Sequence, residues 1–89
     1  MRRIAAWFIR SLLEGPSVSA LGLVLDEPSA QASVEGNKHA NLVEALIVQG
    51  WYSVRVNEVT TILRKGDTGG VIVSYTDNKT TLKVIYEQT

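Results

Sequence analysis

The chain has 89 residues with nine basic and nine acidic side chains, so its formal net charge is zero. This length accommodates one small domain, and a hydrophobic share of 45% is typical of a globular chain. The balanced charge does not favour nucleic acid or an anionic membrane as a partner. Without cysteine and with a single histidine, the chain has no means to build a disulfide or a thiolate or histidine-rich metal site. We therefore predict one domain over residues 1–89, with no metal and no cofactor.

The N-terminus carries an apolar run that is too short for a targeting segment. Arg2 and Arg3 precede six apolar residues, and Arg10 interrupts them. A secretory signal needs about 7–15 apolar residues and a membrane span about 20. We expect a cytoplasmic location. A long presequence cut near Ala30-Gln31-Ala32 is the alternative.

Residues 2–14 are expected to form the first helix, because Gly15-Pro16 is a strong helix stop. Ile4, Phe8 and Leu12 recur at spacings of four and form an apolar stripe, which Trp7 and Ile9 widen. This pattern favours a helix laid on a sheet. The alternative is an amphipathic helix that docks on a partner or on a membrane surface.

The next segments are predicted from shorter signals. The apolar run Val18–Leu25 lies between Pro16 and Asp26-Glu27-Pro28, which favours a buried strand, although periodicity alone does not exclude a helix. Residues 26–37 are rich in small and polar residues and are expected to form a loop.

A second helix is expected between Asn37, a suitable N-cap, and Gly50. One side of it would be apolar, formed by Leu42, Val43, Ala45, Leu46 and Ile47. His39 lies at the edge of this side and has no evident partner in the sequence. We expect it to be a packing residue rather than a ligand.

The segment from Trp51 to Arg64 shows the period-2 alternation of a half-buried strand. Tyr52, Val54 and Val56 form its first apolar set, and beyond Glu58 the apolar set changes phase. One long strand with a bend near Asn57-Glu58 explains this pattern. Two separate strands joined by a tight turn are the alternative.

Two further strands are predicted around residues 71–76 and 82–87, with turns at Lys65–Gly70 and at Asp77-Asn78-Lys79. Together the elements predict an α+β fold in the order α-β-α-β-β-β. Both helices would pack on one face of an antiparallel sheet, and the last strand, Thr80 to Glu87, would be an exposed edge.

The stretch from Leu46 to Thr68 loosely resembles the first helix and the following hairpin of P-II-like signalling proteins. That resemblance implies a ferredoxin-like fold, trimers and nucleotide binding between subunits. The chain departs from the pattern after the hairpin, because residues 77–89 continue as strand where a second helix should follow.

Two functions are compatible with these features. The first is a non-enzymatic interaction or assembly module that self-associates, since the core is thin and the last strand is an expected edge. Its candidate interface residues are Trp7, Trp51, Thr80, Leu82 and Val84.

The alternative is a small ligand-sensing regulatory protein that binds an anionic metabolite or nucleotide at the 64–70 loop. Its glycines expose backbone N–H groups, although the loop leads into a strand and not into a helix. The candidate ligand-binding residues are Arg64, Lys65, Gly66, Asp67 and Thr68. Neither a nucleophile–base pair nor a carboxylate pair can be assembled from the sequence, so we predict no catalytic residues.

Overall fold

The computed structural model describes the backbone of residues 2–66 and 69–87 and the side chains of residues 8–66 and 69–85. Within this part of the chain lie three helices: α1 (Arg2–Leu13), α2 (Pro16–Ser19) and α3 (His39–Val48). Six strands accompany them: β1 (Val24–Asp26), β2 (Gln31–Glu35), β3 (Tyr52–Asn57), β4 (Thr60–Arg64), β5 (Gly69–Thr76) and β6 (Lys79–Glu87). The predicted α+β class is confirmed.

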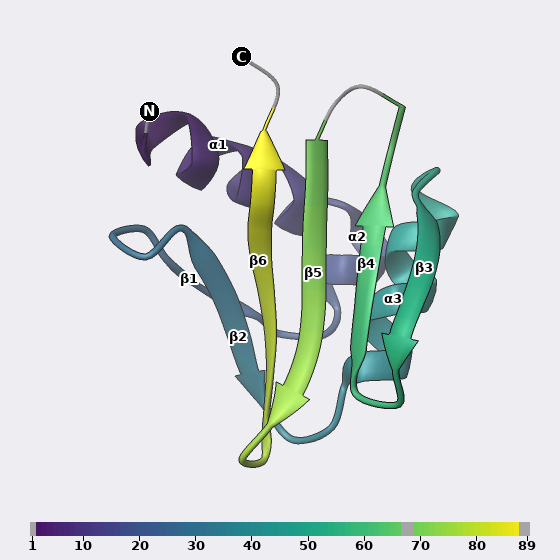
Figure 1. Cartoon of the computed structure of the whole chain (residues 1–89). Coiled ribbons are helices and arrows are strands. Elements are labelled where there is room, and N and C mark those ends of the chain that lie inside the picture. Colours follow the sequence, from purple (N-terminus) through teal and green to yellow (C-terminus); the bar gives the residue numbers. More distant parts are fainter. Residues whose placement is uncertain (1, 67–68, 88–89) are drawn as a thin grey trace.

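All six strands belong to one antiparallel sheet with the order β1-β2-β6-β5-β4-β3. The edges are therefore β1 and β3. Figure 1 shows the helices behind the sheet and no helix in front of it. One sheet face thus remains open among the described residues.

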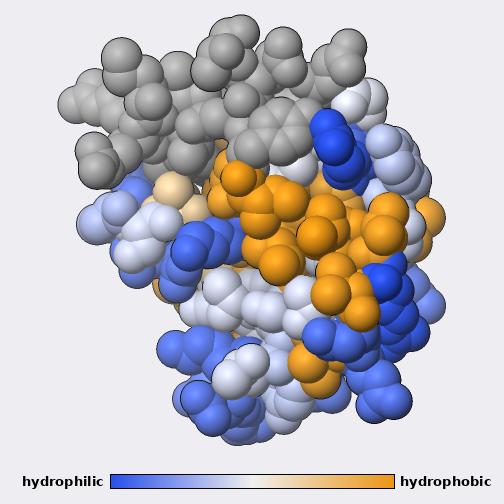
Figure 2. Space-filling model, viewed as in Figure 1, coloured by the Kyte–Doolittle hydropathy of each residue, from blue (hydrophilic) through white to orange (hydrophobic). Residues whose placement is uncertain are grey.

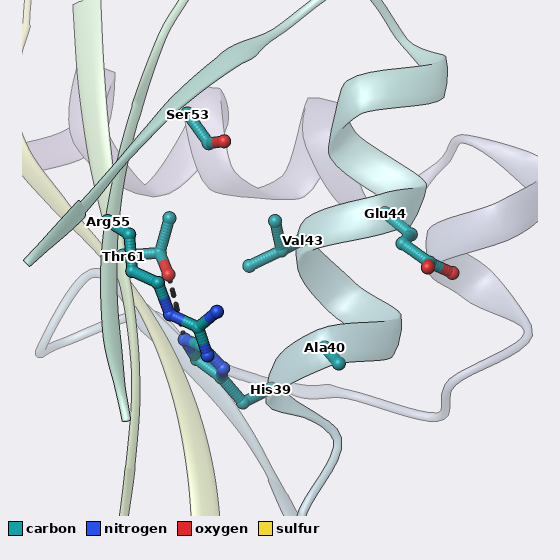
Figure 3. A pocket seen from close by; sticks show the side chains of 7 residues that line it. All are labelled: His39, Ala40, Val43, Glu44, Ser53, Arg55 and Thr61. Carbon is teal, nitrogen blue, oxygen red and sulfur yellow. Dashed lines mark hydrogen bonds between the residues drawn. The ribbon is translucent and has the colours of Figure 1, made fainter. Parts of the chain in front are cut away.

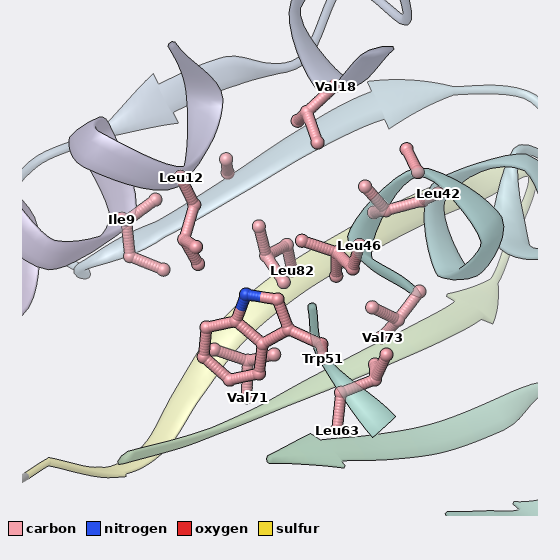
Figure 4. Close-up of a cluster of buried hydrophobic side chains, with 12 residues drawn as sticks. Ile9, Leu12, Val18, Leu42, Leu46, Trp51, Leu63, Val71, Val73 and Leu82 are labelled. Atoms are coloured by element: carbon pink, nitrogen blue, oxygen red, sulfur yellow. The ribbon is translucent and has the colours of Figure 1, made fainter. Parts of the chain in front are cut away.

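The core lies between the helices and the sheet (Figure 4). It consists of Ile9, Leu12, Val18, Ala32, Leu42, Ala45, Leu46, Trp51, Leu63, Val71, Val73 and Leu82. The indole of Trp51 packs against Phe8, with ring centroids 6.0 Å apart. Gly50 ends α3 in the left-handed region as predicted, and the Trp51 N–H donates to the Leu46 carbonyl at 3.1 Å. This C-cap turns Trp51 into the core directly after the helix.

The predicted strand over Val18–Leu25 is wrong for most of its length. Residues 16–19 form α2, and only the end of the run enters β1. Pro16 occupies the start of α2, where its fixed φ and missing N–H suit a helix. Pro16, which was expected to lie just before a strand, therefore starts the short helix α2 instead.

The predicted loop over residues 26–37 contains a strand. Strand β2 pairs with β1 on one side and with β6 on the other, and its Ala32 lies opposite Leu82. Ala32 is fully buried. The local sequence did not indicate a strand because β2 depends on a pairing partner about fifty residues away, and strand preference is strongly set by such neighbours.

The prediction of one long strand with a bend near Asn57-Glu58 is also wrong. The alternative, two strands joined by a tight turn, is confirmed. Strands β3 and β4 form a hairpin whose register shifts between Arg55 and Asn57. In its turn, the Asn57 Oδ1 accepts a hydrogen bond from the Val59 N–H at 2.9 Å. The Arg55 guanidinium donates to the carbonyls of Asn57 (3.1 Å) and Glu58 (3.3 Å). This register shift, a β-bulge, and the turn together cause the change of phase in the apolar alternation beyond Glu58.

The hairpin between β5 and β6 supplies a test of the fold. Asp77 and Asn78 both have positive φ, 54° and 61°, as a two-residue turn between antiparallel strands requires. Because a β-branched residue is strained in this region, Asn78→Val should lower the free energy of unfolding by about 1–2 kcal/mol. Asn78→Gly should leave it unchanged or raise it. Urea unfolding of both variants checks this, and equal stabilities would contradict the turn.

Candidate interaction surface

The predicted ligand loop is described only in part. Lys65 donates from its Nζ to the Gln49 carbonyl at 2.9 Å, so its ammonium joins the loop to the end of α3. Arg64 ends β4 with a half-buried side chain, and Gly66 adopts a positive φ. Asp67 and Thr68 lie outside the described residues. Ligand binding at this loop therefore stays a prediction.

The predicted edge strand is an edge for only part of its length. Strand β6 pairs with β5 from Lys79 to Glu87 but with β2 only from Lys79 to Lys83, which places Thr80 and Leu82 inside the sheet at 0% exposure. The Thr80 hydroxyl donates to the Gly36 carbonyl at 2.7 Å and accepts from the Lys38 N–H at 2.8 Å, so it holds the loop before α3. These two residues therefore hold the fold together rather than form a surface.

The other candidate interface residues lie as follows. Trp51 is buried at 4% exposure, and Val84 is half-buried against the core. Trp7 belongs to α1, but its side chain lies outside the described residues. Trp51 and Val84 thus offer a partner little accessible area.

Strand β3 is the exposed edge that sequence reasoning missed. All six of its residues are exposed, and its apolar side chains Tyr52, Val54 and Val56 are 55–57% exposed. The register places Ser53 and Arg55 opposite Leu63 and Thr61, whose side chains are buried on the helix side. Alternation along the strand therefore directs Tyr52 and Val54 to the open face of the sheet.

The apolar side chains continue across the open face. Val54 pairs with Ile62, and Ile62 pairs with Ile72, so three apolar residues form one row over β3, β4 and β5. Figure 2 shows apolar residues gathered over these strands. We call Tyr52, Val54, Val56, Ile62 and Ile72 the β3 surface. Contiguous exposed apolar area of this kind marks interaction sites in monomeric folds.

A hollow of about 180 Å³ opens on the helix side of β3 (Figure 3). It is lined by His39, Ala40, Val43, Glu44, Ser53, Arg55 and Thr61. Its volume is below the roughly 300–1,000 Å³ of ordinary ligand pockets. Glu44 and Arg55 are the two charged side chains of its lining. The hollow forms because the helix layer leaves the inner side of the edge strand uncovered.

His39 is a buried residue of this lining. It is 6% exposed, and its Nε2 lies 3.0 Å from the Thr61 hydroxyl oxygen. Burial lowers the pKa of His39 below its ordinary value of 6.5, and the positive charge of Arg55 lowers it further. The ring is therefore neutral at pH 7. The expectation that His39 is a packing residue agrees with this position.

The depressed pKa of His39 predicts how stability varies with pH. Above pH 6.5 the ring is neutral in both states. As the pH falls below 6.5, the unfolded chain binds a proton that the folded chain does not, so stability decreases until the folded pKa is reached. The free energy of unfolding should therefore fall more steeply in the unmodified chain than in His39→Gln as the pH decreases below 6.5. Parallel curves from urea unfolding would contradict the assignment.

Two kinds of feature, a membrane-spanning helix and a metal-binding cluster, are absent from the described residues. Within residues 2–66 and 69–87, no helix is both long enough and apolar enough to cross a membrane. The same part of the chain contains no group of three or more His, Asp or Glu residues able to hold a metal ion.

Comparison of the chain with protein-family models, with curated proteins and with solved structures found no match. The resemblance of residues 46–68 to P-II-like proteins gains no support from the fold, because β5 and β6 directly follow the β3–β4 hairpin. The candidate function therefore depends on the physical character of the surfaces alone.

Proposed function

We propose that this protein is a non-enzymatic assembly module that self-associates through the β3 surface. The observation that carries the proposal is the exposure of Tyr52, Val54 and Val56, each more than half exposed, on an edge strand. An antiparallel sheet with one open face normally presents polar side chains there. The cytoplasmic location expected from the sequence is part of this proposal.

Two physical contributions favour association at this place. Burying apolar side chains contributes about 25 cal/mol per Å² removed from water. An edge strand also carries backbone N–H and C=O groups that a further strand can pair. Because the formal net charge is zero, two copies approach without overall repulsion.

Dilution followed by NMR tests the proposal at the level of residues. Amide signals of β3 and of its neighbours Ile62 and Ile72 should shift with protein concentration, whereas signals of β1, on the opposite edge, should not. Spectra that do not change between low and high micromolar concentration would contradict self-association. Shifts confined to the helices would assign the contact to another surface.

A further inference from the structure

The two edges of the sheet differ in how well they are protected against pairing. Strand β1 has three residues and ends at Asp26, and Glu27 and Pro28 follow it, where Glu27 forms an ion pair with Arg10. Short length, charge, proline and β-bulges are the usual means of blocking an edge. Strand β3 has six residues without proline or lysine, Arg55 is its single charge, and its register shifts between Arg55 and Asn57. Of the two edge strands, β3 is therefore the less protected, along Tyr52–Arg55 ahead of the shift.

The side chains of β3 limit how two copies of the strand can pair. In an antiparallel pair, the side chains of two opposite residues lie on the same face of the sheet. If a two-fold axis perpendicular to the sheet relates the two strands, it therefore passes midway between one residue and the same residue of the second copy. We name each arrangement by that residue. An axis at Arg55 places two guanidinium groups opposite each other, which is unfavourable. An axis at Ser53 pairs Tyr52 with Val54 but leaves Val56 opposite Gly50, which offers it no side chain.

An axis at Val54 centres the pairing within the regular part of the strand, which ends at Arg55, where the register with β4 shifts. Val54 then lies opposite Val54 of the second copy, and each Tyr52 comes beside the Val56 at the shift. Aromatic and β-branched residues form favourable cross-strand pairs on one sheet face. On the helix side, Ser53 lies opposite Arg55 of the second copy.

We propose that two copies of this chain pair antiparallel through β3 with Val54 opposite Val54, which joins their sheets into one continuous sheet. This inference rests on the proposed self-association and specifies its geometry. The contact involves one strand of each copy, less than the roughly 20–30 residues a side of a standard interface. The dimer is therefore expected to be weak, with dissociation in the micromolar range.

Single-cysteine variants test the register directly, because the chain contains no cysteine of its own. Opposite residues of an antiparallel pair have Cα atoms about 4.5–5.5 Å apart, within disulfide reach. Val54→Cys should therefore give a disulfide-linked dimer under mild oxidation. In the same register Ser53 and its copy are diagonal neighbours about 7–8 Å apart, so Ser53→Cys should cross-link poorly. Ile72→Cys lies two strands from the edge and should not cross-link.

The outcomes separate this inference from the proposed function. Preferential cross-linking of Val54→Cys, with unchanged circular dichroism, supports the register. Preferential cross-linking of Ser53→Cys or of Ile72→Cys would overturn it and leave self-association standing. If no variant cross-links, the solution mass of the unmodified chain distinguishes two cases. A chain that is a dimer overturns only the proposed register. A chain that is a monomer at high micromolar concentration overturns the proposed function as well.

Discussion

Replacement of Leu82 by alanine is expected to lower the free energy of unfolding by about 3–5 kcal/mol. Leu82 is fully buried on β6, and its neighbours across the sheet are Ala32 and Val73. Truncation removes buried methyl groups and leaves a cavity that the two flanking strands prevent from collapsing. A domain of this size has a total stability of about 5–15 kcal/mol, so the variant should approach the limit of folding.

Urea unfolding at 25 °C measures this loss. Val24→Ala is the matched control, because Val24 is 70% exposed on β1 and its truncation should change stability by less than about 0.5 kcal/mol. If Leu82→Ala fails to fold, the more conservative Leu82→Met should fold with a loss below about 1.5 kcal/mol. Similar losses in Leu82→Ala and Val24→Ala would contradict the central position of β6.

The second large effect concerns assembly rather than folding. Val54→Lys should weaken self-association by about 100-fold or more, because two ammonium groups would face each other across the two-fold axis. The folded chain should keep its stability within about 0.5 kcal/mol, since Val54 is 57% exposed and lies outside the core.

Val24→Lys is the control for this variant. It places the same charge on a still more exposed valine of the opposite edge strand. Its dissociation constant should equal that of the unmodified chain. An equal weakening by the two substitutions would indicate a general effect of charge and would contradict association through β3.

Local signals account for the parts of the fold that the sequence predicted. Pro16 keeps the preceding Gly15 out of the helical region, at φ −63° and ψ 140°, so α1 ends before it, and Gly50 ends α3 at a positive φ. Both effects are local and act irrespective of tertiary contacts. The turn at Asp77-Asn78 is likewise an intrinsic preference of its residues. The strands on either side of it alternate clearly, and the structure places β5 and β6 there.

The parts that the sequence did not predict depend on contacts between distant segments. Strand β2 forms because β6 and β1 pair with it, and the single fully buried side chain it contributes is the small Ala32. The central position of β6 follows from the same pairing. Without β2 on the sheet, the last strand is the natural edge, and its Thr80 and Leu82 are natural candidates for an interface.

The candidate site was missed for a related reason. Tyr52, Val54 and Val56 form an apolar alternating set, which in a single sequence indicates a face turned to the core. The pairing with β4 directs this set to the open face instead. Leu63 and Thr61 are buried on the helix side, and their partners Ser53 and Arg55 lie on the same side. The phase change beyond Glu58 was the available signal, since it requires the apolar sets of the two hairpin strands to lie on opposite faces.

The solution mass of the 89-residue chain over a range of concentrations tests the central claim most directly. Sedimentation equilibrium should show a monomer that converts to a dimer in the micromolar range, while Val54→Lys remains monomeric under the same conditions. An unmodified chain that stays monomeric at high micromolar concentration would contradict assembly through the β3 surface.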